Sequence, residues 1–286
     1  MALEEERVAS RSAGKVAFVL GGGGVLGAHE VGMLQALAEA GIRPDVIIGT
    51  SVGAINGVFA AAYPKGIEKL ADLWRSGGVM SVFDGSLVTR VGTFLRSGTH
   101  VQSSHGLEGL LAELLPVERI EDLEVPFQCV AASIERATAH WFIDGPIIPA
   151  VLASSAVPGL LPAVRIGEEH FLDGGLVHSI PVGRAVALGA ETVYVLHVGR
   201  IERALAAPRR PWQVGMVAFE IARRHRFFEE MASLPKDVKV HVLPAGADSP
   251  SPRGDLSPLR YRDTSRIDVH IQRAYQASRS YLESIA

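Results

Sequence analysis

The stretch from residue 45 to residue 53 decides the fold, and it reads Asp-Val-Ile-Ile-Gly-Thr-Ser-Val-Gly. Its first half is a β-branched apolar run, which is typical of a buried strand, and the small residues of 52–62 predict a helix. Between them lies a Gly-x-Ser-x-Gly motif, Gly49-Thr50-Ser51-Val52-Gly53. In a nucleophile elbow this motif forms a strained turn from which the serine projects. Ser51 is therefore a candidate nucleophile.

A second unit of the same kind precedes this one. Residues 15–20 form a short apolar run, residues 21–27 read Gly-Gly-Gly-Gly-Val-Leu-Gly, and apolar side chains recur at helical spacing over residues 28–40. Two successive strand–loop–helix units predict a parallel sheet. The backbone N–H groups of the glycine loop can point at a negative oxygen, as in an oxyanion hole or a phosphate cradle.

Nucleotide binding is one alternative for this loop. Gly22, Gly24 and Gly27 match the Gly-x-Gly-x-x-Gly pattern of dinucleotide-binding folds, which expect an acidic residue at the end of the second strand. Here Asp45 stands at the start of that strand instead. The pattern disfavours this interpretation, and a dinucleotide retained on purification would support it.

A third feature is Asp173-Gly174-Gly175, which follows the run His170-Phe171-Leu172. The two glycines allow the aspartate to approach another loop closely, because no side chain follows it. The alternative is an ordinary turn aspartate, and Asp-Gly occurs twice more, at residues 84–85 and 144–145.

These three features resemble the patatin-like phospholipases, whose glycine-rich loop, Gly-x-Ser-x-Gly and Asp-Gly-Gly occur in this order. The runs Ala153-Ser154-Ser155-Ala156-Val157-Pro158 and Leu161-Pro162-Ala163-Val164 also look like that family. The resemblance covers about residues 15–182. It implies an α/β fold, a three-layer sandwich with a mainly parallel central sheet, related to the α/β-hydrolases.

The resemblance also implies a mechanism. In that family an aspartate takes the serine proton directly, so Ser51 is expected to attack an acyl ester with Asp173 as its base and to form an acyl-enzyme. The expected oxyanion donors are the backbone N–H groups of Gly22, Gly23 and Gly24. The supporting glycines of the motifs are Gly27, Gly49, Gly53, Gly174 and Gly175. The expected substrate is a phospholipid or another long-chain acyl ester.

Two residues depart from the family pattern. Leu26 stands where the family often has a basic residue, and Ser179 stands where it often has an asparagine. Neither change removes a catalytic atom. The missing basic side chain weakens any expectation of an anionic headgroup at that position.

Two other functions remain open. A Ser-His-Asp esterase or thioesterase would take its histidine from His178, His197 or His270, and His197 is the best placed because it follows a predicted strand. A non-catalytic, lipid-binding regulatory module on the same fold would leave the site unused.

The composition limits the kinds of partner and cofactor that we expect. The formal net charge is -3 and the pI is about 6.4, so we do not expect nucleic-acid binding. Cys129 is the only cysteine and the histidines lack ligand spacing, so no cofactor, metal or disulfide is predicted. Oligomeric state is not predictable from this sequence.

The expected location is cytoplasmic, because residues 1–15 lack the apolar core of a leader and the single cysteine suits a reducing compartment. The apolar stretches are also too short to span a bilayer. Membrane contact is therefore expected to be peripheral. Its candidate is Pro211–Met231, which combines aromatic side chains with arginines.

We expect one domain over residues 15–286 after a flexible N-terminus at 1–14, with a motif-bearing core at 15–182 and a less defined part at 183–286. The Gly- and Ser-rich stretch 76–104 is a candidate lid. Predicted strands are 15–20, 45–49, 126–134, 140–143, 163–166, 192–198 and 238–243, and predicted helices are 28–40, 52–62, 66–74, 107–115 and 263–282.

Overall fold

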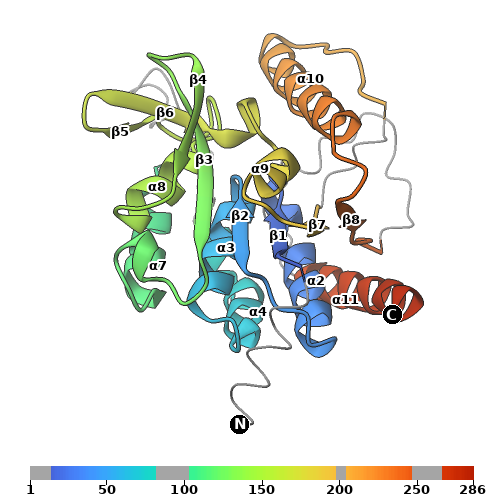
Figure 1. Ribbon diagram of the computed structural model, residues 1–286. Coiled ribbons are helices and arrows are strands. Elements are labelled where there is room, and N and C mark those ends of the chain that lie inside the picture. The colour runs from blue at the N-terminus through green and yellow to red at the C-terminus, as the bar shows by residue number, and fades with distance from the viewer. Residues whose placement is uncertain (1–13, 82–102, 198–203, 247–265) are drawn as a thin grey trace.

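The computed structural model describes residues 14–81, 103–197, 204–246 and 266–286. Over these ranges one mixed sheet lies between helices on both of its faces (Figure 1). The strand order is β5-β6-β3-β2-β1-β7-β8, and β4 pairs with β3 beside this path. The strands are β1 (Val16–Leu20), β2 (Val46–Gly49), β3 (Phe127–Ser133), β4 (Thr138–Phe142), β5 (Val164–Ile166), β6 (Glu169–Asp173), β7 (Thr192–Leu196) and β8 (Lys239–Val242).

Strands β3, β2, β1, β7 and β8 run parallel to one another, while β4, β5 and β6 form an antiparallel part at one end. This confirms the predicted α/β fold with a mainly parallel sheet. The helices are α2 (Ala28–Glu39), α3 (Val52–Ala62), α4 (Ile67–Arg75), α5 (Gly78–Ser81), α7 (His105–Leu114), α8 (Ile147–Ser154), α9 (Val182–Ala187), α10 (Pro211–Ala232) and α11 (Ile267–Ile285). Short 3-10 turns are η1 (Gly24–Gly27), η2 (Ile120–Asp122) and η3 (Gly174–Leu176).

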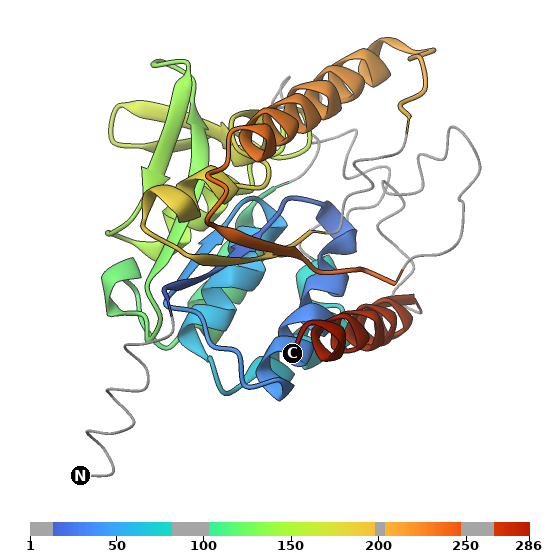
Figure 2. The ribbon, with the colours of Figure 1, turned by 45° about the vertical axis from the view of Figure 1, so that its right-hand side comes forward.

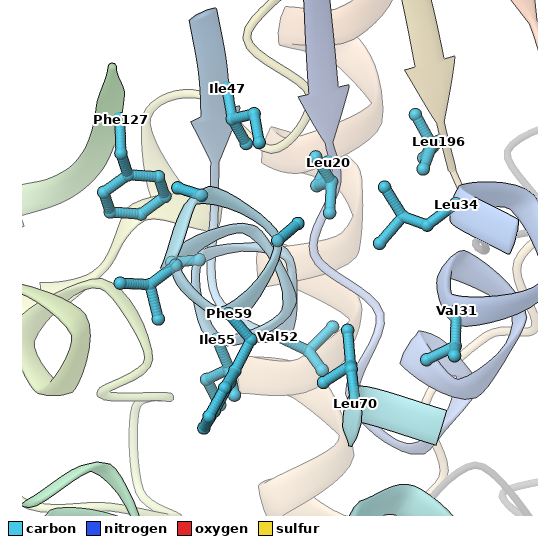
Figure 3. Close-up of a cluster of buried hydrophobic side chains, with 14 of the residues drawn as sticks. Leu20, Val31, Leu34, Ile47, Val52, Ile55, Phe59, Leu70, Phe127 and Leu196 are labelled. Atoms are coloured by element: carbon cyan, nitrogen blue, oxygen red, sulfur yellow. The ribbon is translucent and has the colours of Figure 1, made fainter. Parts of the chain in front are cut away.

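The central strands bury side chains on both faces. In β1, Phe18 and Leu20 join the larger apolar cluster with α2 and α3, whereas Ala17 and Val19 join a smaller cluster with α9. Figure 3 shows the larger cluster, where Leu20 and other strand residues face the apolar side chains of α3. Because both faces are covered, the central strands read as continuous apolar runs rather than as an alternation.

The sequence missed β6, α5, α8 and α9, and α5 is a helix of only four residues inside the stretch that was predicted as a candidate lid. Helix α8 is eight residues long, includes Pro149 and is apolar almost throughout, so it carries no helical periodicity. Strand β6 mixes Glu169 and His170 with apolar residues because it lies in the antiparallel part of the sheet. Helix α9 has six residues, fewer than two turns.

The chain after residue 182 adds strands to the sheet and helices to its faces. Strands β7 and β8 extend the sheet beyond β1, and α11 packs against α2, beside which it lies in both views (Figures 1 and 2). The two helices touch closely, since a Cβ on Gly32 would lie 2.1 Å from the carbonyl oxygen of Ile271. Residues 1–13 of the predicted flexible N-terminus and residues 82–102 of the predicted lid lie outside the described ranges.

Candidate active site

The turn that carries Ser51 joins β2 to α3 and is strained. Ser51 has φ 57° and ψ −126°, a conformation that side-chain-bearing residues rarely adopt. The turn also brings backbones close together: a Cβ on Gly53 would lie 2.4 Å from the carbonyl oxygen of Leu20, and a Cβ on Gly49 would lie 2.4 Å from that of Gly53. These contacts give the physical reason for both glycines of the motif.

Asp173 reaches this serine from the end of β6. Strand β6 pairs antiparallel with β3, in the register Ala131 to Asp173, and β3 lies next to β2. The Ser51 hydroxyl donates to Asp173 Oδ2 over 2.6 Å, and the Gly175 N–H donates to Oδ1 over 2.7 Å. The structure thus brings together two residues that are 122 positions apart in the chain.

The pair is withdrawn from solvent. Ser51 is 8% exposed and Asp173 is 1% exposed. Burial raises the pKa of Asp173 to about 6, because a charged carboxylate loses its hydration there; the hydrogen bonds from Ser51 and Gly175 and the charge of Arg223 oppose the shift. At neutral pH the carboxylate is therefore mostly ionised, and it is a stronger base than an ordinary aspartate.

The glycine loop lies directly against the serine. A Cβ on Gly22 would lie 3.3 Å from Ser51 Cβ, which is tight for any side chain. The Gly22 N–H already donates to the Ser179 carbonyl over 3.1 Å. Within the described residues, no hydrogen bond engages the N–H of Gly23 or Gly24. Of the three predicted donors, those two are therefore available to an incoming oxygen.

Comparison with known families bears on this arrangement. The sequence model of a protein family described as patatin-like phospholipase matches residues 18–186, which include the loop, the serine turn and Asp173. The chain belongs to this family. The resemblance inferred from the motifs is confirmed.

Individual patatin-like relatives match over a similar region. The lysophospholipase nte1 of Emericella nidulans is 32% identical over 205 residues, which cover 68% of this chain and 13% of that protein. The patatin-like phospholipase domain-containing protein 7 of Rattus norvegicus is 33% identical over 189 residues, 64% of this chain and 14% of that protein. The chain thus matches about a seventh of these relatives' length. Among solved structures, VipD from Legionella pneumophila covers 95% of this chain at 15% identity, with a TM-score of 0.46 and 67% of its own chain covered.

Two serines of the patatin-like region hold the Ser51 backbone. Ser154 Oγ accepts from the Ser51 N–H over 3.1 Å, and the Ser155 hydroxyl donates to the Ser51 carbonyl over 3.2 Å. Both residues are buried at the end of α8. The sequence marked this run as family-like but gave neither residue a role.

A buried amide holds the end of the glycine loop. Asn56 Nδ2 donates to the Gly27 carbonyl over 3.0 Å and to Glu30 Oε2 over 2.7 Å, and Asn56 Oδ1 accepts from Trp74 Nε1 over 2.9 Å. Burial raises the pKa of Glu30 well above its usual range. Helices α2, α3 and α4 are thereby linked beside the loop.

The three candidate histidines occupy other positions. His178 Nδ1 forms a hydrogen bond with Glu230, the His197 ring stacks on Phe227, and the His270 ring lies against His29. Across the described ranges, neither Ser51 nor Asp173 makes a hydrogen bond with a histidine. The serine hydroxyl is instead bonded directly to the carboxylate.

Helix α10, outside the matched patatin-like range, also reaches the site. Arg223 Nη1 donates to the Gly22 carbonyl over 3.1 Å and to Ser179 Oγ over 3.0 Å. The Phe219 ring lies next to Gly175, since a Cβ there would be 3.0 Å from Phe219 Cζ. The sequence singled out Pro211–Met231 as a candidate for membrane contact but gave no sign that Arg223 faces the loop.

Neither a metal cluster nor a spanning helix occurs in the part of the chain that the structure describes. No group of three or more His, Cys, Asp or Glu side chains there has the arrangement to hold a metal ion. No helix in the same ranges is long and apolar enough to cross a bilayer.

Proposed function

We propose that this chain is a lipid acyl hydrolase in which Ser51 attacks a carboxyl ester of a phospholipid or related lipid, with Asp173 as its direct base. The observation that carries the proposal is the 2.6 Å hydrogen bond from the Ser51 hydroxyl to Asp173 Oδ2. It joins the two motifs in a buried place, next to a loop with free N–H donors. Family membership supports the same chemistry.

The reaction proceeds in two halves. Ser51 Oγ attacks the ester carbonyl carbon while its proton passes to Asp173, and the tetrahedral intermediate collapses as the alcohol leaves with that proton. Water then gives a proton to Asp173 and attacks the acyl-enzyme, which releases the carboxylic acid and restores Ser51. The raised pKa of Asp173 suits both proton transfers.

The developing oxyanion needs donors, and we assign that role to the N–H groups of Gly23 and Gly24. The Gly22 N–H is committed to Ser179, so its part is to fix the loop. Helix α3 begins at Val52, and the positive end of its dipole also faces the oxyanion. Loss of one such donor typically lowers kcat by about 100- to 1000-fold.

The hydrogen-bond pattern favours a Ser-Asp dyad over a Ser-His-Asp triad. A triad needs a histidine between serine and acid, whereas here the carboxylate occupies the position that the imidazole would take. His197, the best-placed candidate from the sequence, packs on Phe227 of α10.

Hydrolysis of para-nitrophenyl acyl esters of several chain lengths tests the proposal. Wild type and His197→Ala are expected to be active, while Ser51→Ala and Asp173→Asn lose activity by at least about 1000-fold, as removal of a nucleophile or its base does. A His197→Ala variant that is folded yet as inactive as Ser51→Ala would establish the triad. Wild type inert on all esters and on phospholipid would favour the lipid-binding module.

The relatives support a choice of first substrate to assay. Those named lysophospholipase make a one-chain phospholipid the first lipid to assay, beside a two-chain phospholipid and a triglyceride. Release of fatty acid from the one-chain lipid, lost in Ser51→Ala, is the expected result.

We further propose that α10 contacts a lipid surface through its outer face. Val214, Ile221 and Phe228 are each more than half exposed and follow one another at intervals of seven residues, so they line one side of the helix. Arg209 and Arg210 are exposed at its start and suit anionic headgroups.

Vesicle sedimentation tests this contact. Replacing Val214, Ile221 and Phe228 by glutamine is expected to weaken binding to vesicles of anionic phospholipid by at least about tenfold, because three exposed apolar side chains are lost. Hydrolysis of a short, water-soluble ester should be unchanged. Equal vesicle binding by wild type and variant would contradict the contact.

A further inference from the structure

Arg223 is a charged side chain held in a buried position. It is 7% exposed, and three of its nitrogens have partners. Nη1 donates to the Gly22 carbonyl and to Ser179 Oγ, while Nε and Nη2 donate to the Glu220 carboxylate one turn earlier on α10. A buried guanidinium must satisfy its donors to offset lost hydration, so its orientation is fixed.

The contact with the Gly22 carbonyl also sets the direction of the N–H of the next residue, Gly23. A peptide unit is planar and trans, and cis bonds are absent from the described residues, so the Gly22 C=O and the Gly23 N–H point in opposite directions. A donor that holds the carbonyl on one side therefore holds the N–H on the other. The positive charge also polarises the peptide, which strengthens Gly23 as a donor.

Ser179 fixes the other side of the same residue. Its carbonyl accepts from the Gly22 N–H, and its hydroxyl accepts from Arg223. Both peptide units that flank Gly22 are thus held from outside the loop. A glycine at this position has no side chain to restrict its own rotation, so these external contacts set its orientation.

Helix α10 is itself docked at a second point. Glu230, seven residues after Arg223, bonds to His178 Nδ1 and accepts from the Gly183 N–H, and Phe227 between them is buried in the smaller apolar cluster. The spacing places these three side chains on one face of the helix. This face of α10 places Arg223 against the glycine loop, although Arg223 and Gly22 are 201 residues apart in the chain.

We propose that Arg223 is a positioning residue for the oxyanion hole: it holds the Gly22 carbonyl so that the Gly23 N–H faces the tetrahedral intermediate on Ser51. This inference rests on the proposed hydrolase function. It makes α10 part of the catalytic apparatus, although Arg223 lies outside the range that the family model matches.

The role predicts a defined kinetic effect. The oxyanion forms only after Ser51 attacks, so loss of Arg223 should lower kcat and leave KM nearly unchanged. The charge of Arg223 also lowers the pKa of Asp173, so the acid side of the pH–rate profile should move to higher pH without it. A purely structural role would produce neither change in enzyme that remains folded.

The test compares Arg223→Met, Arg223→Lys and Arg224→Met on a soluble para-nitrophenyl ester. Arg224 is the matched control, since it is the next arginine on α10 and pairs with the same Glu220 carboxylate. We expect kcat to fall about 10- to 100-fold in Arg223→Met, which is less than deletion of a donor, and about 3- to 10-fold in Arg223→Lys. Arg224→Met should keep the wild-type kcat.

Rates are divided by the fraction of enzyme that circular dichroism and size exclusion show to be folded, and Arg223→Lys decides the outcome if Arg223→Met does not fold. A folded Arg223→Lys with wild-type kcat would overturn the proposal, as would an equal loss in Arg224→Met. Because lysine keeps the positive charge, the shift of the pH profile is expected in Arg223→Met and not in Arg223→Lys. An inert wild type would instead refute the hydrolase function itself.

Discussion

Helices α3 and α10 both reach the Ser51–Asp173 pair, but they are held in opposite ways. Every residue of α3 is buried, and the helix approaches β1 so closely that Gly53 touches the Leu20 carbonyl. Helix α10 turns one face to the protein through Arg223 and Glu230, while its other face, with Ile221 as an example, is exposed.

This difference separates the part of the site that close packing fixes from the part that a few contacts position. The position of α3, and with it Ser51, follows from close packing, which tolerates little change. The position of α10 relies on a few contacts of its inner face, which are the polar ones of Arg223 and Glu230 and the apolar one of Phe227. Changes in α3 are therefore expected to affect stability first, and changes on the inner face of α10 to affect catalysis first. The predictions on Gly53 and Gly215 below test that contrast, and the one on Asp173 tests the carboxylate that both helices reach.

The largest effect is expected in α3. Gly53→Ala would place a methyl group 2.4 Å from the Leu20 carbonyl oxygen, so either β1 or α3 must move. We expect a loss of about 3 kcal/mol or more in the free energy of unfolding, at the upper end of overpacking effects. Urea denaturation measures it. Full stability in Gly53→Ala would show that the turn is looser than this packing implies.

A smaller effect of opposite sign is expected at Asp173. Its pKa is about 6 in the folded protein against an ordinary value of 3.8, so ionisation of the buried carboxylate opposes folding above pH 6, and this cost disappears as the pH falls toward 4. Asp173→Asn should therefore be inactive yet more stable than wild type at pH 7.5, by up to about 3 kcal/mol.

Urea denaturation of wild type and Asp173→Asn at pH 7.5 and pH 4.5 checks the sign of this stability difference. The advantage of Asp173→Asn should shrink at the lower pH, because the wild-type carboxyl is then protonated in the folded state. An advantage that stays constant between the two pH values would show that burial does not perturb the Asp173 carboxyl.

The smallest effect is expected on the outer face of α10. Gly215 is exposed, and a Cβ there would meet nothing within 4 Å, in contrast to Gly53. Gly215→Ala should stabilise the protein by about 0.5–1 kcal/mol through helix propensity, with no change in ester hydrolysis. A destabilised Gly215→Ala would indicate that this face of α10 is covered by another part of the molecule.

Much of the fold was predictable because the central strands are short apolar runs with loops at their ends. The helix over 52–62 was predicted with the bounds that α3 has. The antiparallel strand β6 was missed, although it positions Asp173, because its polar residues hide the strand pattern.

The residues of the site also differ in whether the sequence could predict them. Ser51 and Asp173 stand in local motifs, so their places in the chain could be marked in advance. Arg223 could not, because an arginine in an arginine-rich helix gives no sign of which one turns inward. The use of the Gly22 N–H by Ser179 was equally hidden, since it joins residues that periodicity does not relate.

The central claim is that Ser51 is the nucleophile and that Asp173 activates it directly. The most direct test is to react the folded protein with a long-chain fluorophosphonate across a pH series and to locate the adduct by peptide mass spectrometry. We predict an adduct on Ser51 whose rate of formation is half-maximal near pH 6, lost in Asp173→Asn and retained in His197→Ala. An adduct on another serine, or labelling that survives Asp173→Asn and disappears in His197→Ala, would contradict it.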